Sequence, residues 1–166
     1  DESSAPWATD RPRHDPGRIP MTVASQDEQH SQQQRAQVLL YSDDYTTREK
    51  VRTAVGRRAS IDTALIQWTD VATPEAVEEY VHNRHFDLLV LDGESPKHGG
   101  MGLTRTLKSE VYNCPPVLLL IARAEDAWLA SWSEAEAVVG YPLDPFVVQE
   151  AVAEILREAK PAASRS

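Results

Sequence analysis

Three aspartates follow apolar stretches of the sequence, at positions where their carboxylates could do chemistry together. Asp43 and Asp44 stand one residue beyond the stretch 38–41, and Asp92 directly follows residues 86–91. Converging carboxylates repel one another by roughly 4 kcal/mol per pair at about 4 Å and an effective dielectric of about 20. A hard cation such as Mg²⁺, which prefers oxygen ligands, removes that repulsion. The three residues therefore predict a magnesium site in which one carboxylate accepts a phosphoryl group.

A simpler interpretation gives these aspartates only local roles. Asp is common at helix N-caps and in turns. Asp43 and Asp44 would then cap the next helix, and Asp92 would begin a loop. The choice between the two interpretations depends on whether the fold brings the ends of the two apolar stretches together.

Five predicted strands alternate with helices along residues 37–160. The strands are predicted from apolar runs at residues 38–41, 64–68, 86–91, 117–121 and 137–140. Between them lie amphipathic helical patterns, one of which begins with Thr73 as N-cap and Pro74 at the first helical position. The last helix, which starts at Pro145, has the clearest apolar stripe.

Strands that are apolar throughout are typical of a parallel sheet covered by helices on both faces. The sequence therefore predicts an α/β fold with a doubly wound five-stranded parallel sheet of order 2-1-3-4-5. In this order the first and third strands are neighbours, and functional groups collect at their carboxyl ends. Asp43, Asp44 and Asp92 are predicted to lie there, which favours the site over the purely local roles.

Composition separates two terminal segments from this domain and disfavours several classes of function. The chain has 166 residues and a net charge of −9, which argues against a nucleic-acid partner. Residues 1–36 are rich in Pro and Gln and predict an extended arm, and residues 161–166 form a short tail. The longest apolar run, residues 117–122, is too short for direct membrane insertion. Cys114 is the only cysteine, which excludes an internal disulfide.

Residues 37–160 resemble a response-regulator receiver domain of the chemotaxis-regulator type. Asp43 and Asp44 match the family's metal-binding acidic pair, and Asp92 matches its phosphoryl-accepting aspartate. The loop signature that follows is matched by Pro96, Gly100 and Met101. The resemblance implies a flavodoxin-like receiver fold with Mg²⁺ at the three aspartates and Asp92 as the phosphoacceptor equivalent.

Two departures from the family pattern argue against an ordinary phosphorylation switch. Ile121 stands where the family has a Ser or Thr that binds the phosphoryl group, and Tyr141 stands where it has a Lys before a Pro. The resemblance therefore implies a degenerate switch, with no enzymatic activity, unless Arg123 or Lys97 supplies the missing cation. Without contacts that differ between two states, modification of Asp92 shifts no equilibrium.

Large aromatic side chains predict a surface for a protein partner. Trp128 and Trp132 are four residues apart, so they share one face of a short helix. Burial in the core is the alternative. With Phe146 they would form a contact patch on the surface through which receivers commonly bind partners, and Trp7 and Ile19 would extend the contact from the arm.

These features predict an atypical stand-alone receiver that acts as a regulatory or accessory subunit of a larger assembly. The chain most resembles the orphan receivers that accompany the bacterial NADH:quinone oxidoreductase, respiratory complex I. The expected location is the cytoplasm, at the cytoplasmic face of the membrane when the partner is bound. The alternative is a working phosphoacceptor in a two-component phosphorelay, with Asp92 phosphorylated by a histidine kinase.

Overall fold

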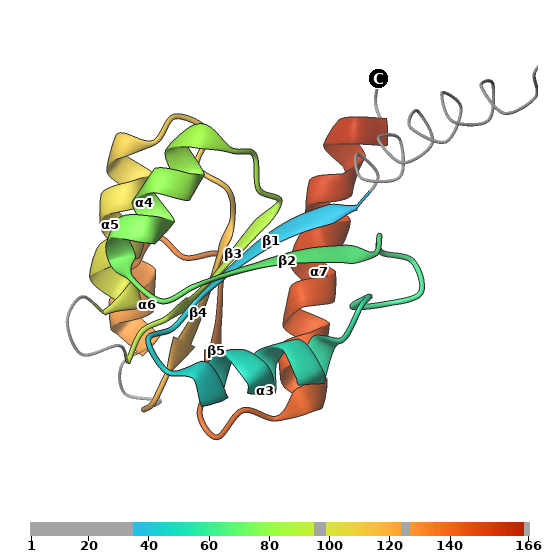
Figure 1. The fold of residues 1–166 in the computed structure, drawn as a ribbon, viewed down its shortest axis with the longest axis horizontal. Coiled ribbons are helices and arrows are strands. Elements are labelled where there is room, and N and C mark those ends of the chain that lie inside the picture. The colour runs from blue at the N-terminus through green and yellow to red at the C-terminus, as the bar shows by residue number, and fades with distance from the viewer. Residues whose placement is uncertain (1–34, 95–98, 124–126, 165–166) are drawn as a thin grey trace, which may run out of the picture. The chain divides into compact units, whose positions relative to one another are not determined.

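A computed structural model describes residues 35–94, 99–123 and 127–164, and it contains one five-stranded parallel sheet (Figure 1). The strand order β2-β1-β3-β4-β5 confirms the predicted α/β doubly wound fold. The strands are β1 (Ala36–Tyr41), β2 (Ile66–Val71), β3 (Leu88–Asp92), β4 (Val117–Ile121) and β5 (Ala137–Gly140). Four residues with predicted roles lie outside the described residues: Trp7, Ile19, Pro96 and Lys97.

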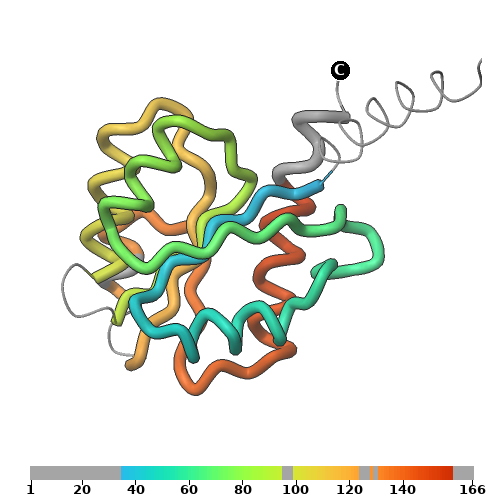
Figure 2. The backbone as a smooth tube through the Cα atoms, in the orientation of Figure 1, coloured from blue at the N-terminus to red at the C-terminus, as the bar shows by residue number. Residues whose placement is uncertain are grey.

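One helix follows each strand, as the tube in Figure 2 shows along the chain. The helices are α3 (Tyr45–Val55), α4 (Pro74–Asn83), α5 (Gly100–Glu110), α6 (Ala127–Ser133) and α7 (Pro145–Ser164). Helices α3 and α7 cover one face of the sheet, and α4 and α5 cover the other (Figure 1). Within the described part of the chain, none of the helices combines the length and apolar character needed to span a membrane.

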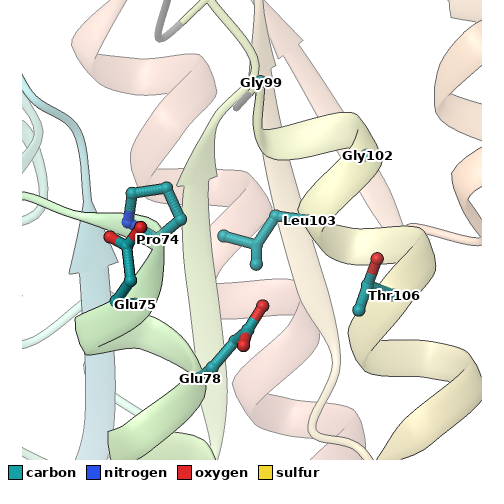
Figure 3. Close-up of a pocket in the computed structure, with 7 residues that line it drawn as sticks. All are labelled: Pro74, Glu75, Glu78, Gly99, Gly102, Leu103 and Thr106. Carbon is teal, nitrogen blue, oxygen red and sulfur yellow. The ribbon is translucent and has the colours of Figure 1, made fainter. Parts of the chain in front are cut away.

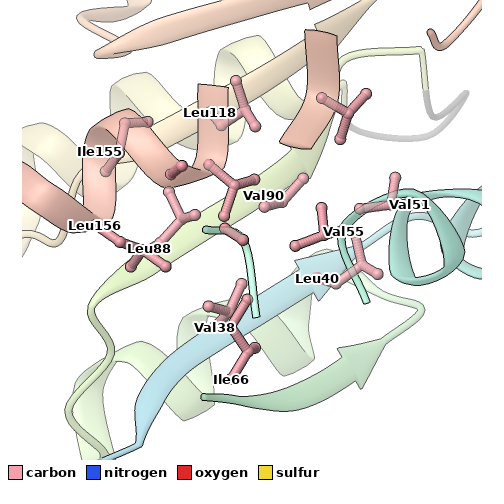
Figure 4. Close-up of a cluster of buried hydrophobic side chains, with 14 of the residues drawn as sticks. Val38, Leu40, Val51, Val55, Ile66, Leu88, Val90, Leu118, Ile155 and Leu156 are labelled. Atoms are coloured by element: carbon pink, nitrogen blue, oxygen red, sulfur yellow. The ribbon is translucent and has the colours of Figure 1, made fainter. Parts of the chain in front are cut away.

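Alternate residues of each central strand belong to two separate hydrophobic cores, because successive side chains of a strand point to opposite faces of the sheet. Val38 and Leu40 of β1 pack with Val51 of α3 and Val152 of α7 (Figure 4 shows part of this cluster). Leu39 belongs instead to the cluster under α4 and α5. Strands β3 and β4 are buried along their whole length. Burial on both faces fixes the register of the sheet, so the carboxyl ends of β1 and β3 lie side by side.

The second strand begins and ends later than predicted. Its observed range, Ile66–Val71, replaces the predicted 64–68 because Tyr41, the last residue of β1, pairs with Val71. The added residues Thr69 and Asp70 are polar, and they are tolerated because β2 lies at the edge of the sheet. Hydrophobicity alone therefore misplaced an edge strand, whereas the central strands were found with small shifts.

Helix α5 lies directly against the end of β3. Gly100 is its first residue, and a Cβ built there would lie 2.8 Å from the Asp92 carbonyl oxygen and 2.9 Å from its carbon. Such distances are shorter than any ordinary carbon contact, so only glycine allows this approach. The close packing fixes the start of α5 beside Asp92.

Candidate functional site

Asp92 is the last residue of β3, and its side chain is only 4% exposed. It lies at the predicted position, the carboxyl end of the central strand between β1 and β4. The next residue, Gly93, donates its backbone N–H to the Leu120 carbonyl at 2.7 Å, which keeps the chain close to β4. A buried carboxylate needs hydrogen-bond donors to offset the loss of water.

Three neutral donors satisfy the Asp92 carboxylate. The Ser42 hydroxyl donates to Oδ2 at 2.7 Å, and the Tyr141 hydroxyl donates to Oδ1 at 3.2 Å. The backbone N–H of Glu94 also donates to Oδ1, at 3.0 Å. Among the described residues, the hydrogen bonds to this carboxylate thus come from two hydroxyls and one amide, and none comes from a cation.

The acidic pair after β1 does not join Asp92 in a cluster. Asp44 is the N-cap of α3, where its Oδ1 accepts from the Thr46 N–H at 2.9 Å and its Oδ2 from the Thr47 hydroxyl at 3.3 Å. Asp43 is exposed. The local role is therefore observed for Asp44, and the convergence of the three carboxylates on a metal stays a prediction.

The arrangement does not fit a preformed magnesium site. Mg²⁺ takes carboxylate and carbonyl oxygens in near-octahedral geometry, whereas here each carboxylate oxygen of Asp92 and Asp44 accepts at least one hydrogen bond from the protein. In residues 35–94, 99–123 and 127–164 no three His, Cys, Asp or Glu side chains are grouped so as to hold a metal ion. Metal binding by Asp43, Asp44 and Asp92 remains a prediction from the resemblance.

Ser42 is a site residue that the sequence did not reveal. It follows β1 directly, is fully buried, and also accepts the Asp44 backbone N–H at 3.0 Å through its hydroxyl. The carboxyl end of β1 thus presents a hydroxyl to Asp92, while the acidic pair begins one residue later. A small polar residue at the end of a buried strand was the available signal, but the neighbouring charges drew the prediction to Asp43 and Asp44.

Tyr141 directly follows β5 and reaches Asp92, although the sequence predicted it only as a lost lysine. Burial raises the pKa of its hydroxyl well above the ordinary value of 10.0, and the negative charge of Asp92 raises it further. The hydroxyl therefore stays protonated at neutral pH and acts as a donor. The structure thus places a neutral donor at Asp92, and the role of Tyr141 in place of a family lysine stays a prediction from the resemblance.

Ile121 ends β4 between the strands that carry Asp92 and Tyr141. Its side chain is 3% exposed, and it has no group that could bind a phosphoryl oxygen. The backbone around it is used for other contacts. Its carbonyl accepts the Tyr141 N–H at 2.8 Å, and the N–H of the next residue, Ala122, donates to the Glu94 carboxylate at 3.0 Å.

Arg48 is a cation near the site, but it contacts groups other than the Asp92 carboxylate. One guanidinium nitrogen donates to the Ser42 carbonyl at 2.5 Å, and Nε lies 3.5 Å from the Asp70 carboxylate on β2. Arg123, one of the two predicted substitutes for the missing lysine, lies exposed beyond the end of β4. The other, Lys97, lies outside the described residues, so the substitution stays a prediction.

The predicted aromatic side chains are exposed. Trp128 is 67% exposed, Trp132 49% and Phe146 79%. Burial of the two tryptophans in the core, the alternative interpretation, is therefore wrong. The Arg105 guanidinium of α5 lies 5.1 Å from the ring centre of Trp132, so this ring has a partner on one side, and Arg105 also donates to the Trp132 carbonyl at 2.8 Å.

A cavity of about 400 Å³ lies between α4 and α5, away from the predicted chemistry (Figure 3). Its lining combines two acidic side chains with glycines at the start of α5, and it comprises Pro74, Glu75, Glu78, Gly99, Gly102, Leu103 and Thr106. None of the three predicted aspartates lines it. The candidate site is therefore taken at the buried end of β3, where the predicted aspartate lies.

Comparisons with known proteins agree with this architecture. No family model matches the chain. An uncharacterized response regulatory protein of Mycobacterium tuberculosis, matched in two strains, is 44% identical over 120 residues, which cover 72% of this chain and 90% of the relative.

Solved structures share the fold at lower identity. A CheY-like receiver domain protein from Methanospirillum hungatei superposes with a TM-score of 0.62 at 18% identity, over 77% of this chain and 98% of that one. A chemotaxis response regulator of Vibrio cholerae gives a TM-score of 0.63 at 18% identity, over 74% and 99%. Together with the 44% identical relative, these matches show that the chain belongs to the response-regulator family and that its described fold is a receiver domain.

Proposed function

We propose that this chain is an atypical receiver that acts by binding a protein partner, without an ordinary phosphorylation switch. The observation that carries the proposal is the set of donors on Asp92: two hydroxyls and one backbone N–H. All three are satisfied by the unmodified carboxylate. The Asp92 carboxylate is therefore already hydrogen-bonded in the unphosphorylated state, which is the state that is modified in an ordinary receiver.

A phosphoryl group on Asp92 would gain few contacts of its own. Cations bind phosphoryl oxygens much more strongly than neutral donors do, and the places expected for a hydroxyl and a lysine hold Ile121 and Tyr141. A modification shifts a conformational equilibrium only as far as its contacts differ between the two states. The proposal follows because those differential contacts are reduced at both positions.

Exposed aromatic side chains support the binding role. Trp128, Trp132 and Phe146 expose large apolar surfaces on α6 and at the start of α7. Tryptophan is enriched among the residues that dominate the free energy of protein association. We therefore assign the partner surface to these three side chains, with Trp7 and Ile19 as proposed further contacts.

The assembly that we propose as the partner is the NADH:quinone oxidoreductase, respiratory complex I, on the strength of the resemblance to orphan receivers. The chain would then be a cytoplasmic accessory subunit, held at the membrane by its partner. The test is size fractionation of detergent-solubilised native membranes from cells that express the full tagged chain. We expect the chain in the same high-mass fraction as complex I subunits identified by mass spectrometry.

The matched variants for this test are Trp128→Ala/Trp132→Ala and Tyr112→Ala. Tyr112 is 91% exposed and lies just after α5, so it controls for the loss of an exposed aromatic ring. The double variant should run at the size of the free chain, and Tyr112→Ala should behave as wild type. A wild-type chain found only as free monomer would contradict the binding role.

The second candidate function is phosphoryl acceptance from a histidine kinase. The position of Asp92 at the carboxyl end of β3, beside β1, favours it. The test is incubation of the full chain with acetyl phosphate and Mg²⁺, read by intact mass, with Asp92→Asn as the control. We expect no phosphoryl adduct on the wild type, whereas an adduct that Asp92→Asn abolishes would establish the alternative.

A further inference from the structure

The hydrogen bonds around Asp92 connect the carboxyl ends of four strands, and we infer that this strand-end network is a metal-independent structural bridge. It consists of the Ser42, Asp92, Glu94 and Tyr141 side chains and the Ala122 N–H. The inference goes beyond partner binding because it assigns a role to the residues that stand in the place of the switch.

The first arm of the network spans three strands that are not all neighbours. Ser42 follows β1, and Asp92 ends β3, which pairs with β1. Tyr141 follows β5, which lies at the edge of the described sheet and pairs with β4. The Tyr141 hydroxyl therefore reaches across the end of β4 to Asp92, and it makes a connection that no backbone ladder provides.

The second arm connects β3 to β4. Glu94 lies two residues after Asp92, and its backbone N–H donates to Asp92 Oδ1 while its carboxylate accepts the Ala122 N–H. Ala122 directly follows β4, and the preceding residue accepts the Tyr141 N–H. The segments after β3, β4 and β5 are thus held to one another by side-chain and backbone hydrogen bonds.

Burial makes these contacts important for stability. Asp92 is 4% exposed and Ser42 is fully buried, so a donor that is removed cannot be replaced freely by water. The two hydroxyls also bind opposite oxygens of the carboxylate, Oδ2 and Oδ1, so within the described part of the chain its hydrogen bonds come from neutral groups.

The test measures the thermal midpoint, Tm, of the full chain for wild type, Ser42→Ala and Tyr141→Phe. The matched controls are Ser109→Ala, at an exposed serine whose hydroxyl donates to the Thr106 carbonyl one turn away, and Tyr112→Phe. We expect Tm to fall by about 3–8 °C in each network variant and by less than about 1 °C in each control. The inference is overturned if the network variants lose no more than their controls.

Metal independence is tested by repeating the melts with millimolar Mg²⁺. The wild-type Tm should change by less than about 1 °C, whereas a rise of about 3 °C or more would overturn the inference. Ser42→Asp is the positive control, because a carboxylate beside Asp92 adds repulsion that Mg²⁺ relieves. No partner enters these measurements, so the outcome is independent of the co-fractionation and acetyl phosphate tests.

Discussion

The buried end of β3 and the exposed surface of α6 and α7 distribute polarity in opposite ways. At Asp92 a charged group lies inside the protein, and neutral donors satisfy it. On α6 and α7 large apolar rings lie outside, at 67%, 49% and 79% exposure. A buried charge without its hydrogen bonds and an exposed aromatic group without a partner are both unfavourable. The first is compensated within the chain, and the second is the surface that we propose a protein partner covers.

We expect the Asp92 region to matter for the stability of the fold and the aromatic surface of α6 and α7 to matter for the proposed function. The Asp92 region has the features of a structural site, because its polar atoms are mutually satisfied. The aromatic surface, which we propose as the binding site, leaves its apolar area exposed. Substitutions at the first should therefore lower the free energy of unfolding, and substitutions at the second should lower partner affinity.

Gly100→Ala is the strongest expected disruption of the buried end. The added methyl group would meet the Asp92 backbone at 2.8 Å, so α5 must move away from β3. We expect a loss of about 3 kcal/mol in the free energy of unfolding, measured by urea denaturation.

Gly102→Ala is its control in the same helix. A Cβ there meets no atom within 4 Å, and alanine favours helix, so stability should rise by about 0.5–1 kcal/mol. Equal effects of the two substitutions would show that α5 does not rest on Asp92 as described.

Asp92→Asn distinguishes a satisfied carboxylate from a repelled one. In a cluster of carboxylates, neutralising one member relieves repulsion and stabilises the fold. Here the charge accepts three hydrogen bonds, so we expect a loss of about 1–2 kcal/mol in urea denaturation. Glu110→Gln, at an exposed carboxylate at the end of α5, should change stability by less than about 0.5 kcal/mol. If Asp92→Asn stabilised the chain instead, the carboxylate at the end of β3 would be repelled by other negative charges in the wild type.

The two tryptophans should differ in their effect on folding. Trp132 has the Arg105 guanidinium 5.1 Å from its ring centre, whereas Trp128 is the more exposed of the two. Trp132→Ala should therefore lose about 0.5–1 kcal/mol in urea denaturation, and Trp128→Ala should lose less. If both variants unfold as wild type, the Arg105 contact adds nothing and Trp132 serves binding alone.

The smallest effect concerns alkaline pH. The Tyr141 pKa is higher in the folded chain than its ordinary value of 10.0, so the unfolded chain loses this proton first. The contribution of Tyr141 is fully present below about pH 10 and declines as pH rises above it. Tyr141→Phe should show a weaker decline in Tm across that range than Tyr112→Phe. Identical alkaline profiles would contradict the raised pKa.

The core and the site were predictable to different degrees. Val38, Leu40 and Val152 were readable because burial on a helix or strand face leaves a periodic apolar pattern. Ser42 was not, because nothing in the sequence indicates where the hydroxyl of one serine points. The charge of Asp44 led to the prediction that it joins a cluster of carboxylates. In the structure its carboxylate accepts hydrogen bonds from the first turn of α3 instead. Local hydrogen bonds thus decided its position.

The sequence by itself determined the strand order, the two cores and the presence of an aspartate at the end of β3, since periodicity and chain connectivity leave few arrangements. Only the tertiary structure decided that Ser42 and Tyr141 meet at Asp92, because β1, β3 and β5 are brought together by packing of the sheet. It also decided that the tryptophans are exposed. Helical spacing shows which residues share a face, but what covers that face depends on the neighbouring elements.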